Sequence, residues 1–269
     1  NILVLVFISI LLINSISLFN STSDVRDINK QTKFQTELNT DFLNLRFILK
    51  TLQEISTDIA LMGERDCLEE IKAVKKEYIN AVNEIKSMKL NSENSAFLKQ
   101  INNTFDVYFN SLFTMAEAGV KRKEARDLSK NIMAKFDAAV NQVEEEINKL
   151  NDLSKVDKLE IKYQVVSTQE ILTDALAMGD QGGIDESKNI QKNLNKYLDE
   201  VIEKYPNLKS NILTLKNKYN NLSIQGQKMA MQGVIFENML TKVESQMLIV
   251  DDIASKVEKL IGETSKKEL

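Results

Sequence analysis

The chain has 269 residues, 28% of them charged, and a formal net charge of −4 at neutral pH, so no basic footprint for nucleic acid is present. The absence of histidine excludes His-based triads and most zinc sites, and the single cysteine excludes an intrachain disulfide. With one proline, eight glycines and 43% hydrophobic residues, the composition predicts an all-α protein with a sizeable core.

An uncharged run, ILVLVFISILLINSISLF, occupies residues 2–19. It is long enough to cross a bilayer as a helix, and we predict a transmembrane helix over residues 1–20. A cleaved signal peptide is the alternative explanation. Against it, no small-residue cleavage pattern follows the run, and the run is longer than the usual core of a signal peptide.

Six further helices are predicted from apolar periodicity and from the residues that end each helix. Gly63 ends the first helix, residues 91–94 separate the second from the third, a glycine-rich loop at residues 179–183 follows the fourth, and Tyr205-Pro206 ends the fifth. Ser92 or Asn94 is the expected N-cap of the third helix. The predicted ranges are about 23–62, 66–89, 98–150, 156–178 and 185–204, with a long sixth helix from about residue 206.

The third predicted helix carries one continuous apolar stripe. From Leu98 to Leu150, apolar residues recur at alternating spacings of three and four, which places them on one face of a helix roughly 80 Å long. Midway, the stripe holds Arg122, Arg126 and Ser129 instead of apolar residues. Two arginines on a core face cost free energy unless a partner compensates their charge. This polar break is therefore the clearest indication of function.

Two segments of the chain occur twice. Residues 53–63, QEISTDIALMG, recur as residues 169–179, QEILTDALAMG, with seven of eleven positions identical. Residues 115–120, MAEAGV, recur as residues 229–234, MAMQGV. The offsets of 116 and 114 residues indicate two copies of one unit, each made of two helices and a third, long helix.

Short turns make successive helices antiparallel, and this alternation predicts the architecture. We expect an elongated antiparallel assembly of two stacked four-helix bundles, formed by six helices of which the two long ones are shared. These helices cover residues 21–269. Within this range, a membrane-proximal module takes about residues 21–120 and 234–269, and a distal module takes about residues 121–233.

This arrangement resembles the helical bimodular sensor domain of bacterial transmembrane receptors. The stretch Q-E-I-x-T-D before a glycine turn, and M-A-x-x-G-V followed in the first copy by residues 133–137, MAKFD, also look like sensor segments of methyl-accepting chemotaxis proteins. The resemblance covers nearly the whole chain. It implies a homodimeric chemoreceptor of the bacterial inner membrane, with a periplasmic sensor domain that binds a small ligand, commonly an organic acid, and signals to a cytoplasmic domain.

A carboxylate ligand would account for the arginines on the core face, because the planar guanidinium suits a carboxylate. The structural alternative is that these arginines pair with carboxylates such as Glu117, Glu124 or Asp127, or lie along apolar surface. A drift of the stripe at Gly119 would also turn Arg122 outward. The predicted ligand-binding residues are Arg122, Arg126, Arg65, Arg46, Ser129 and Ser56.

The sequence gives little support to an enzyme. It contains no glycine-rich phosphate loop and no nucleophile elbow, and adjacent acidic residues such as 144–146 point in different directions around a helix. We predict no metal site and no cofactor. The alternative to a sensor of metabolites is a membrane-anchored helical stalk or sensor that binds a protein partner.

Overall fold

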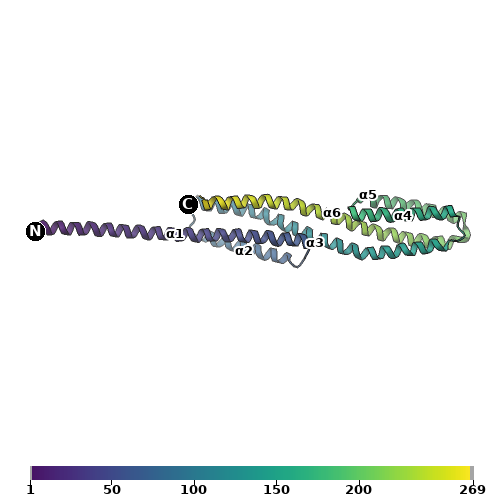
Figure 1. Ribbon diagram of the computed structural model, residues 1–269, viewed down its shortest axis with the longest axis horizontal. Coiled ribbons are helices and arrows are strands. Elements are labelled where there is room, and N and C mark those ends of the chain that lie inside the picture. The colour runs from purple at the N-terminus through teal and green to yellow at the C-terminus, as the bar shows by residue number, and fades with distance from the viewer. Residues whose placement is uncertain (1, 267–269) are drawn as a thin grey trace. The chain divides into compact units, whose positions relative to one another are not determined.

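A computed structural model describes the backbone of residues 2–266 and the side chains of residues 24–257 and 259. Over this part of the chain the protein is all-α, as the composition predicted: it forms six α-helices and one short 3-10 helix, without a strand. Figure 1 shows the helices as long rods, with the N-terminal helix the longest. The helices are α1 Ile2–Met62, α2 Leu68–Ser87, α3 Ser92–Lys149, α4 Lys155–Met178, α5 Gln181–Lys204 and α6 Lys209–Lys266, and the 3-10 helix η1 is Pro206–Leu208.

The predicted transmembrane helix is continuous with the first predicted helix, since α1 runs from Ile2 to Met62 without a break. In the part of the chain whose side chains the structure describes, no helix is long and apolar enough to span a membrane. The uncharged run at residues 2–19 lies outside that part.

Helix ends are set by side-chain caps that the sequence only partly revealed. The predicted N-cap of α3 was wrong: Asn91 takes this role, because its side-chain oxygen accepts a 2.7 Å hydrogen bond from the Asn94 backbone N–H. The predicted loop at residues 179–183 is also shorter than expected. Asp180 accepts bonds from the backbone N–H groups of Gly182 and Gly183, so α5 already begins at Gln181.

Two compact units divide the chain: unit 1 comprises residues 1–52, 72–108 and 252–269, and unit 2 comprises residues 53–71 and 109–251. The predicted modules divided the third helix at residue 120 and the sixth at residue 234. They also left the first turn, residues 63–67, in the membrane-proximal module. The structure assigns that turn to unit 2 because the end of α1 packs against the α3 residues of the same unit.

The core of unit 1 takes side chains from the described parts of α1, α2, α3 and α6. Tyr78 of α2 stacks on Phe105 of α3 with ring centroids 3.5 Å apart, and Phe42 of α1 meets the edge of Phe97 at 5.0 Å. Such aromatic contacts add to the stabilisation from apolar burial. Burial also raises the pKa of Tyr78, since the phenolate would lose its hydration.

The core of unit 2 is a four-helix cluster. Helices α3, α4, α5 and α6 all contribute fully buried apolar side chains, among them Val143, Leu172, Leu198 and Leu222. Figure 1 shows α4 and α5 side by side, next to the end of α3 and the start of α6. Each helix places residues three and four apart on its inner face, which is the pattern expected for bundle packing.

The buried face of α3 departs from the predicted stripe after Gly119. Ala125 is buried, whereas Arg126 and Met133, which the stripe placed in the core, are exposed. The buried face resumes at Phe136 and continues through Val143. Phe136 and Val143 belong to the predicted stripe, so the stripe is interrupted and not displaced, and Arg126 lies outside the core within the interruption.

The sequence repeat corresponds to a repeated helix contact in unit 2. A Cβ atom added at Gly119 would lie 2.7 Å from the carbonyl carbon of Ala60, and one added at Gly233 would lie 2.7 Å from the Cα atom of Leu176. Only glycine allows so close an approach of two helix backbones. The two glycines hold equivalent places in the repeat, as do Ala60 and Leu176, so both copies encode the same contact.

Gly63 and Gly179 complete this contact. They have positive φ angles of 69° and 63° and end α1 and α4, where each backbone N–H bonds to the carbonyl four residues earlier. A side chain at Gly63 would also meet the Gly119 carbonyl oxygen at 2.8 Å. The repeated glycines are therefore paired features of one packing arrangement.

Candidate ligand site at the end of helix α1

Arg122 caps the C-terminal end of α1. Its Nη2 atom donates hydrogen bonds to the carbonyl oxygens of Ala60 at 3.2 Å and Leu61 at 3.0 Å. The last carbonyls of a helix have no partner within the helix and carry partial negative charge, so a guanidinium is favourable there. The glycine contact between Gly119 and Ala60 brings the two helices close enough for Arg122 to make these bonds.

Phe236 lies next to the same guanidinium. The Cζ atom of Arg122 is 5.8 Å from the centroid of the Phe236 ring, within the range of a cation–π interaction. Arg122 is three residues after Gly119, and Phe236 is three residues after Gly233. The two residues therefore occupy equivalent positions in the repeat. The first copy has arginine where the second has phenylalanine, and this difference in sequence creates the pair.

Ser56 lies one helical turn before Ala60 on α1. Its side chain is fully buried, and its hydroxyl has no hydrogen-bond partner in the described structure. The equivalent residue of the second copy is Leu172, which fills the core next to Gly226. A buried hydroxyl without a partner costs free energy, so packing alone gives no reason for serine here.

The other predicted ligand residues are dispersed. Arg65 forms a 2.7 Å ion pair with Glu124, and Arg126 lies 3.8 Å from Asp127; these side chains are more than half exposed. Ser129 donates a hydrogen bond to the Arg126 carbonyl oxygen within its own helix. For Arg65 and Arg126 the structure thus matches the ion-pair alternative.

Of the six predicted residues, the structure brings Arg122, Arg65 and Ser56 to the end of α1. Arg126 and Ser129 follow further along α3. Arg46 is exposed and belongs to unit 1, so it is not part of the candidate site, which lies in unit 2. The predicted cluster of four arginines is therefore reduced to Arg122 and Arg65.

This arrangement can bind an anion. A guanidinium has five N–H donors, and the two described bonds of Arg122 use its Nη2 atom alone. Its Nε and Nη1 atoms donate from different edges of the guanidinium, so a carboxylate could accept a bond from either of them while α1 remains capped. The described residues contain no group of three or more acidic or cysteine side chains that could hold a metal ion.

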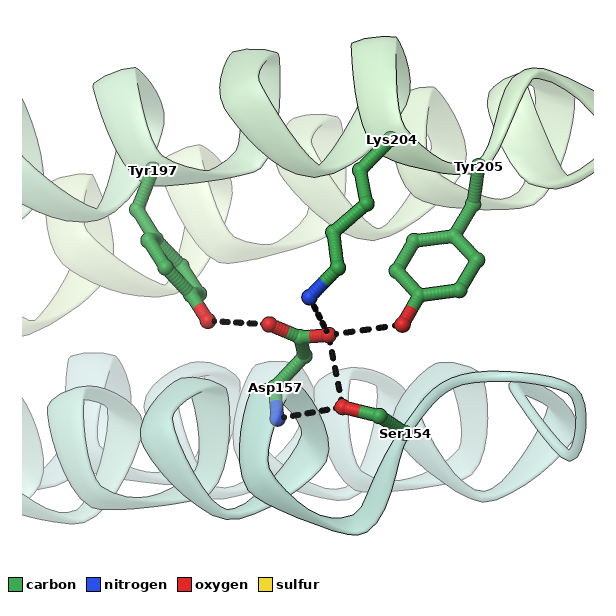
Figure 2. A network of polar contacts seen from close by, with 5 residues as sticks. All are labelled: Ser154, Asp157, Tyr197, Lys204 and Tyr205. Atoms are coloured by element: carbon green, nitrogen blue, oxygen red, sulfur yellow. Dashed lines mark hydrogen bonds and ion pairs between the residues drawn. The ribbon is translucent and has the colours of Figure 1, made fainter.

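A buried polar network in unit 2 was not predicted. Figure 2 shows Asp157, at the start of α4, surrounded by donors from two parts of the chain. Tyr197 and Lys204 of α5 donate to it at 2.8 Å, Tyr205 donates at 2.9 Å, and Ser154 donates at 2.6 Å. The spacing Ser154-x-x-Asp157 is that of a capping box, and this signal could have located the carboxylate in the sequence.

These donors stabilise the charged form of Asp157. The hydrogen bond from Lys204 contributes most, followed by that from Ser154, and together they hold the pKa of the Asp157 carboxyl far below its usual range. Hydrogen bonds from Lys149 and Lys218 lower the pKa of the buried Glu146 in the same way. Because Asp157 is bonded to α5 and Glu146 to Lys218 of α6, we interpret both carboxylates as links between helices and not as ligand sites.

Neither a scan against models of known protein families nor a search of characterised proteins finds a match to this chain.

Proposed function

We propose that this chain is the ligand-sensing, extracytoplasmic part of a transmembrane chemoreceptor, which binds a small organic acid. The observation that carries the proposal is the end of α1, where the half-buried Arg122 keeps spare donors and the buried Ser56 hydroxyl lacks a partner. The same two features would orient a carboxylate and an adjacent polar group. The sequence repeat and the order of the six helices also support the proposal, because they resemble those of helical bimodular sensor domains.

Membrane attachment and the stacked arrangement of the bundles belong to the same proposal. The uncharged run at residues 2–19 supports a membrane anchor in the bacterial inner membrane, with the remaining helices in the periplasm. Four segments contribute to the core of each unit, and this supports two four-helix bundles that share the long helices.

Signal transmission would use the continuous helices. Helix α3 has 58 residues and contributes to both units without a break in its hydrogen-bonded backbone, and so does α6. A ligand that interacts differently with two packings of α1 against α3 shifts the equilibrium between them. The shift would then pass along α6, whose C-terminal segment lies in unit 1 with the start of α1.

A thermal-shift screen tests the proposal. The full chain in detergent is heated with a panel of small carboxylic acids and amino acids, because a ligand that binds the folded state raises the melting temperature by mass action. The expected result is a concentration-dependent rise for at least one carboxylate. This rise should be lost in Arg122→Gln and reduced in Ser56→Ala.

Two controls separate ligand contact from structural damage. Ser56→Ala removes an unpartnered hydroxyl, so it should leave the melting temperature of the free protein unchanged or higher. Arg126→Gln changes an exposed arginine and should leave the ligand response intact. A well-folded sample that responds to no acid, or a response that persists in Arg122→Gln, would refute a carboxylate site at this place.

A second candidate function is binding of a protein partner by a membrane-anchored helical stalk. It is favoured by apolar side chains on α4 that are exposed in the single chain. The two candidates differ in the screen, since only a sensor of metabolites responds to small molecules.

A further inference from the structure

Helix α4 has two apolar faces. Ile161, Val165 and Leu172 are buried in the core of unit 2. Counting about 100° per residue, a second set of apolar residues lies on the opposite side of the helix. Their exposed fractions are 75% for Val156, 66% for Leu159, 66% for Tyr163 and 47% for Val166. We call these four residues the outer face of α4.

The sequence repeat shows that this outer face is not an isolated feature. With the offset of 116 residues, Leu159 and Tyr163 correspond to Leu43 and Phe47 of α1. Leu43 is 56% exposed and Phe47 is 69% exposed, and both belong to unit 1. The inward residues agree at the same offset, since Leu45 and Leu49 are buried like Ile161 and Val165. Both copies thus present a leucine and an aromatic residue outward, one turn apart.

The spacing of the outer face fits a coiled-coil seam. Val156, Leu159, Tyr163 and Val166 are separated by three, four and three residues, which are the a-d-a-d positions of two heptads. A β-branched residue at a followed by leucine at d, as in Val156 and Leu159, favours two parallel strands. The continuation is polar, because Glu170 occupies the next a position and ends the seam.

The flanking charges distinguish parallel from antiparallel pairing of two copies. In a parallel pair, Lys155 at a g position lies opposite Glu160 of the second copy at an e position, and the same contact occurs twice by symmetry. An antiparallel pair centred on the outer face would place Lys162 against Lys162 of the second copy. Opposite charges stabilise the parallel arrangement, whereas like charges oppose the antiparallel one.

We propose that the outer face of α4 is a dimer contact, which packs in parallel against the outer face of α4 in a second copy of this chain. The seam from Val156 to Val166 spans only about 16 Å of helix, so this contact is weak in dilute solution. The inference rests on the proposed function in one respect: a shared membrane supplies the high effective concentration that a short contact requires. It is independent of any ligand.

Cysteine cross-linking of the full chain in lipid vesicles tests the contact. Cys67 is first replaced by serine, and Val156→Cys and Val166→Cys are then introduced separately, together with Lys192→Cys at an exposed position of α5 as a matched control. A short bis-maleimide is added without ligand. In the parallel dimer each outer-face cysteine lies close to its own counterpart, so both variants should give covalent dimer at least fivefold above the control.

The alternatives give different patterns. In an antiparallel pair centred on the outer face, each of these cysteines would be about 15 Å along the helix from its counterpart, and only a mixture of Val156→Cys and Val166→Cys would cross-link. That result, or yields equal to the Lys192→Cys control, would overturn the proposal.

A second substitution, Leu159→Lys, is then combined with Val156→Cys. It should abolish cross-linking of Val156→Cys, while the helix content stays unchanged because Leu159 is exposed. Cross-linking that survives Leu159→Lys would also contradict the assigned face. Since no ligand is present, a failed ligand screen leaves these outcomes unaffected.

Discussion

At the scale of single residues, polar groups inside the bundle fall into two kinds. Asp157 is buried with a full set of donors, whereas the hydroxyl of Ser56 is buried without one. A satisfied carboxylate connects α4 to α5 and stabilises the fold, while an unsatisfied hydroxyl costs free energy. This difference supports a structural role for Asp157 and a binding role for Ser56.

Replacing Asp157 by asparagine tests the structural role. The variant loses the ion pair with Lys204 and part of the hydrogen bonds from Tyr197, Tyr205 and Ser154. We expect a loss of about 2 kcal/mol in the free energy of unfolding, because hydrogen bonds to a charged group are worth more than neutral ones. The melting temperature should fall by roughly 4–8 °C.

Urea denaturation of Asp157→Asn measures this loss. Asp152→Asn, an exposed acidic residue of the preceding turn, is the control and should leave the midpoint unchanged. Equal midpoints for Asp157→Asn and the parent would show that the network in Figure 2 contributes nothing to stability.

The pH dependence follows from the lowered pKa of Asp157. In the unfolded chain an aspartate titrates near pH 4, whereas in the folded protein it keeps its charge to much lower pH. The stabilisation is therefore fully present above about pH 4 and is lost as the pH falls through the folded pKa. We expect the difference in unfolding free energy between the parent and Asp157→Asn to be constant from pH 5 to pH 7 and to shrink below about pH 4. Urea midpoints of both proteins at pH 3 and pH 6 measure it, and an equal difference at both values would contradict the assignment.

At the scale of elements, local patterns in the sequence predicted most of the fold. The lengths of α3 and α6 follow from periodicity and from the absence of proline within them, and the helix ends at Gly63 and Gly179 follow from glycine in the left-handed region. The length of the loop before α5 did not follow, because it depends on whether the Asp180 side chain bonds the next amides. Nor did the position of Arg122, since its partners are carbonyls of a helix about sixty residues earlier.

The repeated glycine contact gives a prediction at this scale. In Gly233→Ala the new methyl group would overlap the backbone of Leu176 on α4, which cannot move as a flexible side chain can. We expect a loss of about 1–3 kcal/mol, the usual cost of overpacking, partly offset by the higher helix propensity of alanine. Circular dichroism during thermal unfolding measures the loss.

Gly182→Ala is the matched control for this substitution. Its new methyl group would meet only the Asp180 side-chain oxygen, at 3.1 Å, and a small rotation relieves that contact. Its stability should therefore change by less than about 1 kcal/mol. If Gly233→Ala were as stable as Gly182→Ala, the close approach of α6 to α4 would not be a feature of the folded protein in solution.

At the scale of the whole molecule, four helices contain residues of both compact units. Helices α1, α2, α3 and α6 pass from the residues of one unit to those of the other with unbroken helical backbone. Opening a helix within one unit removes hydrogen bonds that support its continuation in the other, so we expect the units to unfold together. This coupling is what the proposed transmission of a signal requires.

Asn110→Pro tests the coupling through α3. Asn110 is exposed and lies directly after the division of α3 between Tyr108 and Phe109. Proline there removes one backbone hydrogen bond and clashes with the carbonyl four residues earlier, at a cost of roughly 3 kcal/mol. Asn110→Ala keeps the hydrogen bond and is the control.

Hydrogen exchange at increasing urea concentrations measures the coupling. In the parent and in the alanine variant, the amides around Tyr78 in unit 1 and around Leu198 in unit 2 should lose protection at the same urea concentration. In the proline variant unit 1 should open first, because its segment of α3 is cut off from the larger core of unit 2. Two separate transitions already present in the parent would mean that continuous helices alone do not couple the units, and transmission would then require a ligand to tighten them.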